Sequence, residues 1–312
     1  MHRITDAISH VGPRFGALFA LVILVVGNVL FTPSFATSNN FWSSLLQVSP
    51  TVLVALGMTM VMATGGIDLS VGSLMAIASA AAATSLESGA GLAVLAALAI
   101  TVSIGAANGA IISGLAIQPI IVTLAVLISA RGAAQIITEG QLVPFSHAGF
   151  EFLGRGYIGP VPFQVLVMVA AAAGVWILME ATVFGRYILA IGGNQEAARL
   201  SGVRIFRDKV AVYAVSGLLA GLAGLIETAR LGASDAAKIG LNIELDAIAA
   251  AVVGGTALTG GRAMVVGTVV GALIMQVITT SFNMRLIPYS WSLVWKAAII
   301  LIGVIVQRPR KA

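Results

Sequence analysis

Apolar runs cover most of this sequence and limit the folds that it can adopt. Hydrophobic residues make up 59% of its 312 residues and charged residues only 9%, against about 25% charged residues in soluble domains. A helix that crosses a bilayer needs about 20 apolar residues, and ten runs approach that length. They lie at residues 16–31, 45–64, 71–86, 91–113, 119–138, 162–181, 210–230, 245–259, 264–282 and 289–306. We therefore predict an all-α, polytopic membrane bundle of about ten transmembrane helices, which form a single domain over residues 1–312.

Two of these runs, 71–86 and 245–259, are short and adjoin glycine pairs. Short apolar segments interrupted by glycine are typical of transporters whose helices break to line a cavity. The sequence leaves open whether these two segments cross the membrane or re-enter it.

Lys and Arg residues are distributed unequally over the segments that join the runs. With both termini on the inner side, eleven of them fall on that side and four on the outer side. Basic residues concentrate on the cytoplasmic side of membrane proteins, so we predict cytoplasmic termini and a cytoplasmic loop at 185–209. The longest outer segment, 139–161, is then periplasmic. This bias accounts for the basic net charge without a nucleic-acid partner.

The 185–209 loop is the most basic segment and contains five of the 17 Lys and Arg residues. Within it, Asn194-Gln195-Glu196-Ala197-Ala198-Arg199-Leu200-Ser201 is an Ala-rich helical pattern bounded by Gly193 and Gly202. Asn is a preferred N-cap and Gly a preferred helix end. A short helix in the largest cytoplasmic loop indicates a docking element for a cytoplasmic partner.

Asp68 and Ser70 interrupt an apolar stretch directly before the 71–86 run. A carboxylate at membrane depth is costly and is a candidate for a role in transport or gating. Either residue could instead cap the following helix, and this interpretation is the favoured one.

Glu244 and Asp246 open the 245–259 run, and Asn108 and Gln135 lie within other runs. The two acids stand two positions apart, so on a helix they do not face each other. Stabilisation of a helix N-terminus is therefore favoured over acid–base chemistry. Amides suit the hydroxyl groups of sugars, although they more often join neighbouring helices. All four residues, with Asp68 and Ser70, are candidates for lining a translocation pathway.

Several functions are excluded or disfavoured by what the sequence lacks. It has no cysteine, so disulfides and thiol catalysis are excluded, and its three histidines form no metal-binding pattern. Gly254–Arg262 is rich in glycine, but no Gly-Lys pair of a Walker A motif occurs in the chain. We predict a protein that is not an enzyme, has no ATPase site of its own and needs neither a cofactor nor a metal.

Four segments carry a family resemblance: 65–73, 108–125 followed by Arg131-Gly132, 185–203 and 244–261. On these, the chain resembles the permease subunit of the ribose, xylose, arabinose and galactoside class of bacterial ATP-binding-cassette (ABC) importers. Residues 131–141 and 235–237 look most like the galactofuranose branch. Residues 284–288 have no counterpart in the family pattern, which leaves the role of the last outer loop open.

The resemblance implies a multi-pass protein of the bacterial inner membrane that imports a monosaccharide, a pentose or a hexose. It implies three protein partners: an ABC ATPase subunit inside, a periplasmic sugar-binding protein outside, and a second permease copy, identical or related. By likeness, the short helix at 194–202 is the coupling helix that docks on the ATPase. Its implied coupling residues are Gly193, Asn194, Glu196, Ala197, Ala198, Arg199 and Gly202.

The alternative hypothesis is a secondary transporter that uses an ion gradient to move a small polar solute. It requires a titratable relay within the membrane. The candidates for such a relay are Asp68, Glu180, Glu227 and Glu244.

Overall fold

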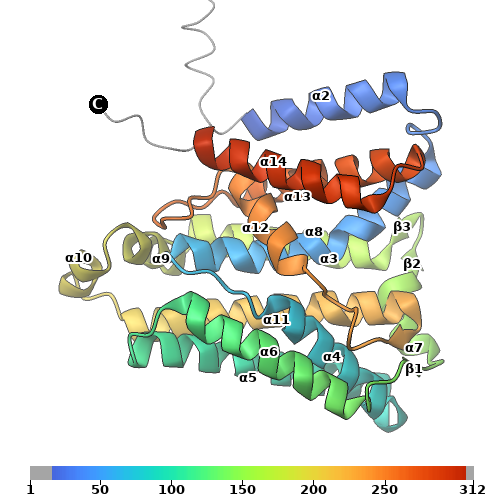
Figure 1. Cartoon of the computed structure of the whole chain (residues 1–312). Coiled ribbons are helices and arrows are strands. Elements are labelled where there is room, and N and C mark those ends of the chain that lie inside the picture. The colour runs from blue at the N-terminus through green and yellow to red at the C-terminus, as the bar shows by residue number, and fades with distance from the viewer. Residues whose placement is uncertain (1–15, 307–312) are drawn as a thin grey trace, which may run out of the picture.

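The computed structural model describes residues 16–306, and these residues form an almost entirely helical bundle (Figure 1). The helices are α2 (Gly16–Phe31), α3 (Ser38–Ala63), α4 (Val71–Ser85), η1 (Leu86–Ser88), α5 (Ala90–Gly114), α6 (Pro119–Ile137), α7 (Ala148–Arg155), α8 (Phe163–Ala181), α9 (Val183–Gly193), α10 (Gln195–Leu200), α11 (Ile205–Leu231), α12 (Ile243–Val253), α13 (Val265–Met284) and α14 (Tyr289–Val306). The strands have two residues each and pair as β1 (Val143–Pro144) with β4 (Ala233–Ser234) and β2 (Tyr157–Ile158) with β3 (Val161–Pro162). The predicted all-α class is confirmed.

Every one of the ten apolar runs contains a helix, but the helices differ in length. Six helices in the described part of the chain are long and apolar enough to span a bilayer, judged by length and composition. They are α3, α5, α6, α8, α11 and α13. The run at 245–259 is not helical throughout: α12 ends at Val253, and a loop with Gly255 and Gly260 at positive φ follows.

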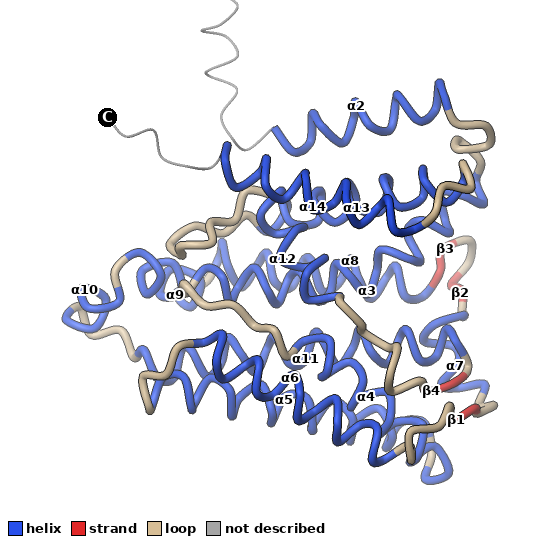
Figure 2. Tube along the Cα trace, viewed as in Figure 1, coloured by secondary structure: helices blue, strands red, loops and turns tan. Residues whose placement is uncertain are grey.

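Helices α4 and α12 are half-length helices, each preceded by a non-helical segment (Figure 2). Residues 64–70 separate α3 from α4, and residues 232–242, which include strand β4, join α11 to α12. The 11 residues of α12 cover only about 16 Å, roughly half of a hydrocarbon core about 30 Å thick. The N-termini of both half-helices therefore lie at mid-depth in the bundle.

The two half-helices meet at Gly72 in the first turn of α4. A Cβ atom placed there would lie 2.6 Å from Glu244 Oε2 of α12, and it would also overlap the Gly240 carbonyl oxygen. Any larger residue would push the two N-termini apart, so glycine at this position allows the contact.

The helices before and after these breaks follow the same order twice. A long helix, a break, a half-helix and two further helices occur as α3 to α6 and again as α11 to α14. The chain enters α4 through Ile67-Asp68-Leu69-Ser70 and α12 through Ile243-Glu244-Leu245-Asp246. Because α3 ends and α11 begins on the side of α9 and α10 (Figure 1), the two groups run in opposite directions. This is the arrangement of an inverted repeat.

Helix α3 is the centre of the bundle. Its residues from Val48 to the C-terminal end at Ala63 are almost all buried, and the helix packs against α11, α12 and α13. Thr59 of α3 and Thr268 of α13 share a hydrogen bond of 2.6 Å between their hydroxyl oxygens. Elsewhere in the bundle, small residues let the helix backbones approach closely, as at Gly105 of α5 against Gly217 of α11.

Candidate coupling and transport sites

The predicted cytoplasmic helix is present as α10, and with α9 it projects from one end of the molecule (Figure 1). Asn194 is its N-cap, because its side-chain oxygen accepts a hydrogen bond from the backbone N–H of Ala197 at 3.0 Å. At the other end the N–H of Val203 donates to the carbonyl of Ala198 at 3.1 Å, while Gly202 has φ +85°. This is a Schellman end, which favours glycine at that position. Local sequence signals therefore define both ends of the helix.

Glu196 and Arg199 form a bidentate ion pair on the exposed face of α10. Arg199 Nε donates to Glu196 Oε2 at 3.0 Å, and a second guanidinium nitrogen donates to Oε1. These hydrogen bonds lower the pKa of the Glu196 carboxyl below its ordinary value. Both side chains are about two-thirds exposed, so this pair is available to a partner, although each residue already has a partner within the helix.

The other predicted coupling residues fall into exposed and buried groups. Gly193, Asn194 and Ala197 are exposed, whereas Ala198 is buried against the rest of the loop. Sequence reasoning missed Leu200, which is 77% exposed at the end of α10. Leu200 adds an apolar side chain to the exposed surface that carries the Glu196–Arg199 pair. The hydrophobic pattern of a six-residue helix is too short to reveal such a residue.

Asp68, Ser70 and Asn108 come together in one buried hydrogen-bonded network. Asp68 Oδ1 accepts from the backbone N–H of Ser70 at 3.0 Å and from its hydroxyl at 2.5 Å. Asn108 Nδ2 of α5 donates to Ser70 Oγ at 3.1 Å, and Ser216 Oγ of α11 donates to Asp68 Oδ2 at 2.9 Å. All four residues are at most 1% exposed. The network joins the start of α4 to α5 and α11.

Neither the Asp68 nor the Ser70 side chain accepts a hydrogen bond from an N–H in the first turn of α4, which the capping interpretation requires. Asp68 instead accepts the N–H of Ser70, the residue that precedes α4, and the Ser70 side chain forms no cap hydrogen bond. The two residues therefore form the turn that leads into α4. Sequence reasoning missed Ser216, because it lies 148 positions away in the chain and an isolated serine in an apolar helix carries no signal.

Glu244 and Asp246 lie in the first turn of α12, as predicted, and are partly exposed. Asp246 is paired with Lys296 of α14, with 3.0 Å between Oδ1 and Nζ. The Lys296 side chain is only 9% exposed. A paired charge is much less costly within a bundle than an isolated one, which explains how a lysine is accommodated on the last helix.

Arg131 of α6 holds the returning segment 232–242 in place. Its guanidinium donates to the carbonyl oxygens of Ala236 at 3.0 Å and Ile239 at 2.6 Å. Gln135, one turn further along α6, is exposed on the surface of the chain. The six predicted pathway residues therefore occupy three places: the buried network, the first turn of α12 and the exposed face of α6.

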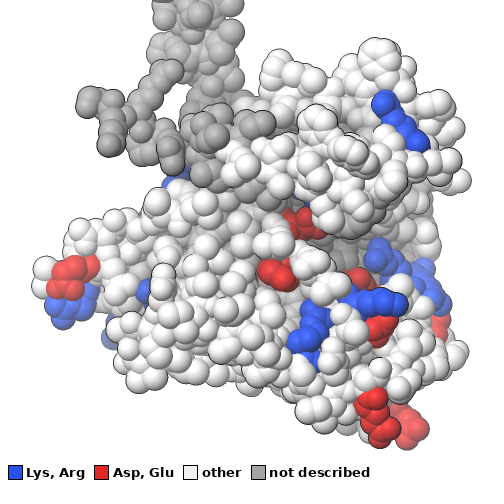
Figure 3. Space-filling view, in the orientation of Figure 1, with Lys and Arg blue, Asp and Glu red and all other residues white. Residues whose placement is uncertain are grey.

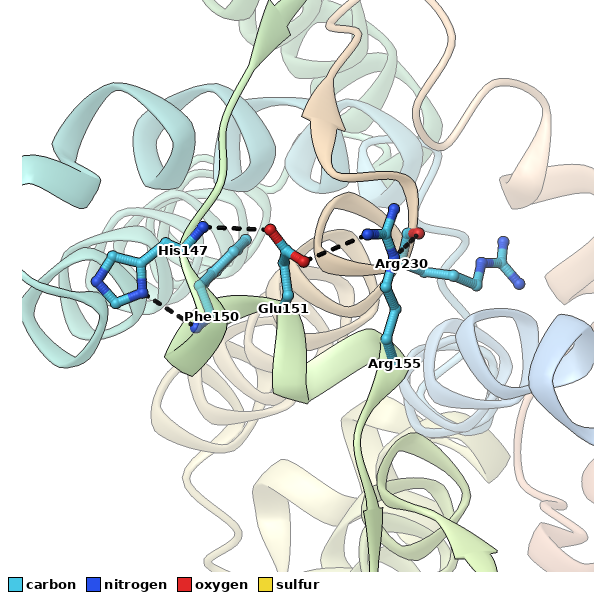
Figure 4. Close-up of polar contacts among 5 residues, drawn as sticks. All are labelled: His147, Phe150, Glu151, Arg155 and Arg230. Atoms are coloured by element: carbon cyan, nitrogen blue, oxygen red, sulfur yellow. Dashed lines mark hydrogen bonds and ion pairs between the residues drawn. The ribbon is translucent and has the colours of Figure 1, made fainter.

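Residues 139–161 form a small folded unit around α7 (Figure 4). His147 Nδ1 accepts the N–H of Phe150 at 3.4 Å, and Glu151 Oε1 accepts the N–H of His147 at 3.2 Å. Glu151 also pairs with Arg155, whose Nε donates to the carbonyl of Arg230 at 2.8 Å. Strand β1 of this segment pairs with β4. The 139–161 segment is thus fastened to the end of α11.

Charged side chains gather toward the two ends of the molecule, apart from a few near the middle of the face in Figure 3. Most of the surface between the two ends is uncharged in Figure 3. Exposed apolar residues include Leu95 of α5 and Val169 and Trp176 of α8. This division of charge is typical of a protein that spans a membrane. Among residues 16–306 there is no group of three or more His, Asp or Glu side chains that could hold a metal ion.

Comparison with known proteins identifies the chain more closely. Residues 40–304 match the family described as the branched-chain amino acid transport system permease component, and the chain belongs to this family. It is 40% identical to the ribose import permease protein RbsC of Bacillus subtilis, over 96% of this chain and 94% of that protein. It is 38% identical to the galactofuranose transporter permease protein YtfT of Escherichia coli, over 94% and 89% respectively. No solved structure matches the chain. The predicted resemblance to ABC sugar-import permeases is confirmed.

Proposed function

We propose that this chain is the membrane-spanning subunit of an ABC importer that moves a monosaccharide inward, driven by ATP hydrolysis on a separate subunit. The observation that carries the proposal is similarity over nearly the whole length to sugar-import permeases. The well-formed helix α10 at one end of the bundle supports it, since a permease without an ATPase site needs a rigid element through which the ATPase acts.

The proposed topology has about ten membrane segments, two of them the half-helices α4 and α12, in the bacterial inner membrane. Both termini and the 185–209 loop are cytoplasmic, and the 139–161 segment is periplasmic. In support, α2 begins and α14 ends toward the side of the molecule where α9 and α10 project (Figure 1). The residues beyond positions 16 and 306 lie outside the described part.

The proposed partners are the ATPase subunit at α10, a sugar-binding protein at the outer end, and a second permease copy. We assign docking on the ATPase to Glu196, Arg199 and Leu200. Asn194 and Gly202 set the helix ends, and Gly193 and Ala197 leave room for the partner. The unit around α7 offers a fixed outer surface to the binding protein.

The proposed pathway residues have two different roles. Glu244, Asp246 and Gln135 are at least partly exposed and are assigned to the wall of the pathway. Charged groups at mid-depth are too costly to face lipid, so a second copy or water must cover this face. Asp68, Ser70 and Asn108 are buried and are assigned to positioning α4.

The substrate class follows from the relatives, which are named for ribose, galactofuranose, fructose and L-arabinose. The family description names branched-chain amino acids instead. We propose a monosaccharide because the sugar permeases match nearly the full length of the chain.

Reconstitution tests this proposal. The chain is placed in liposomes with an ATPase subunit and a sugar-binding protein from the same organism, ATP is sealed inside, and uptake of labelled ribose, galactose, fructose, arabinose and leucine is measured. We expect uptake of at least one sugar and none of leucine. Uptake of leucine alone, or of no sugar, would contradict the proposal.

A further inference from the structure

The end of α9 lies directly on the end of α3, backbone against backbone. A Cβ atom on Gly192 would lie 2.5 Å from the Gly261 nitrogen and would overlap the carbonyl oxygen of Ala63. That same carbonyl accepts a hydrogen bond from the N–H of Gly261 at 3.0 Å. Only glycine at position 192 allows these three chain segments to touch.

A second glycine completes the contact. A Cβ atom on Gly260 would lie 2.8 Å from the Gly192 oxygen and 2.9 Å from the Gly65 nitrogen. Gly65, Gly192, Gly260 and Gly261, with the carbonyl of Ala63, therefore form one cluster of backbone contacts, here called the glycine junction. No side chain lies between these backbones at the contacts, so no rotamer change can absorb a displacement.

The glycine junction connects α10 to both half-helices. On one side, Asn194 directly follows α9 and caps α10. On the other, Gly65 is followed five residues later by Ser70 at the start of α4, and Gly260 lies in the loop that leaves α12 after Val253. The half-helices in turn touch each other at Gly72 and Glu244. A shift of α9 therefore reaches both the segment that enters α4 and the loop that leaves α12 through a short path.

We propose that the glycine junction transmits the movement of the coupling helix to α4 and α12 together, with Gly192 as a positioning residue. The proposal rests on the coupling role assigned to α10 above, and adds the route and the residue. Close packing of this kind moves as a unit, because interfaces have discrete arrangements and do not deform continuously. To demonstrate this role, a substitution must lower the sugar transported per ATP hydrolysed while the ATPase subunit stays bound.

The test compares Gly192→Ala with the matched control Gly174→Ala in the full reconstituted complex. Position 174 of α8 has open space for a Cβ atom, so both variants carry the same change in a helix and only one displaces α9 from α3. We expect Gly192→Ala to retain the ATPase subunit and basal ATP hydrolysis while sugar transported per ATP falls at least tenfold. Gly174→Ala should stay within twofold of wild type. Equal transport per ATP in Gly192→Ala and wild type would overturn the proposal.

A measurement on the wild-type complex does not depend on how well the variant folds. Hydrogen exchange is followed in nanodiscs with and without a non-hydrolysable ATP analogue. We expect the exchange rates of segments 64–70 and 254–262 to change together with those of α10, while the α5–α6 turn at 115–118 stays constant. A change confined to α10 would overturn the proposal. If wild type itself moves no sugar, the proposed function fails, whereas a defect limited to Gly192→Ala concerns the junction alone.

Discussion

Asp68 and Ser216, on segments far apart in the sequence, are joined by a hydrogen bond of 2.9 Å inside the bundle. The bond ties the break before α4 to the long helix α11, which follows α10 in the chain. The carboxylate also accepts two hydrogen bonds from Ser70. One acidic residue thus joins the turn before α4 to α11.

Removal of this carboxylate should destabilise the protein strongly. Asp68→Ala leaves the Ser70 N–H and two buried hydroxyls without their acceptor, at an expected cost of about 2–4 kcal/mol. Ser216→Ala removes only one of the three hydrogen bonds and should cost about 1 kcal/mol. Thermal unfolding of both variants in detergent measures the difference. Equal melting temperatures for Asp68→Ala and wild type would show that the network does not hold α4.

The Asp246–Lys296 pair should behave as a coupled unit. Lys296→Met leaves a mid-depth carboxylate without its cation, whereas the double variant Asp246→Asn with Lys296→Met leaves no charge. We therefore expect the double variant to be more stable than Lys296→Met alone, with a coupling energy of about 1–3 kcal/mol. A double-mutant cycle of thermal stability measures it. Strict additivity of the two changes would mean that the pair contributes nothing.

Substitutions in the Glu196–Arg199 ion pair of α10 distinguish an effect on docking to the ATPase from an effect on helix stability. Reversing either charge, as Glu196→Lys or Arg199→Glu, should weaken binding of the ATPase subunit while the bundle stays folded. The swapped variant, Glu196→Arg with Arg199→Glu, restores an ion pair within the helix but inverts the pattern shown to the partner. We expect it to remain defective in co-purification with the ATPase. Full assembly of both single reversals would contradict the docking role.

Helix α7 packs on α11 through a close backbone contact at Gly154. A Cβ atom on Gly154 would lie 2.3 Å from the Arg230 nitrogen, whereas one on Gly149 would make only contacts of 3.4 Å or longer. Gly154→Ala should therefore lift α7 and weaken affinity for the binding protein, at a cost in stability of about 1–3 kcal/mol. Gly149→Ala is the control. Surface plasmon resonance with the loaded binding protein compares them, and identical affinities would exclude α7 from the outer docking surface.

The sequence predicted those features that depend on neighbouring residues. Asn194 and Gly202 mark the ends of α10, and glycine pairs mark the breaks beside α4 and α12, because capping and chain reversal are local events. The length of the apolar runs was enough to predict the helical class, but not which helices span the membrane alone.

Contacts between distant segments could not be predicted in this way. Arg131 binds carbonyls more than 100 positions away, and Asp246 finds its partner on α14. Neither pairing leaves a pattern in a single sequence, since each depends on how the helices cross. The contact of Gly192 with Ala63 is of the same kind. The sequence shows a glycine at position 192, but it does not show which segment packs against it.

The most direct test of the central claim is the energy source for transport. In reconstituted liposomes with ATP inside, sugar uptake is measured with a protonophore and sodium ionophore, and separately with ATP replaced by its non-hydrolysable analogue. We predict that uptake continues when all ion gradients are collapsed and stops when ATP cannot be hydrolysed. Uptake that persists without ATP hydrolysis but stops with the ionophores would establish an ion-driven transporter and contradict the assignment of this chain as an ABC permease.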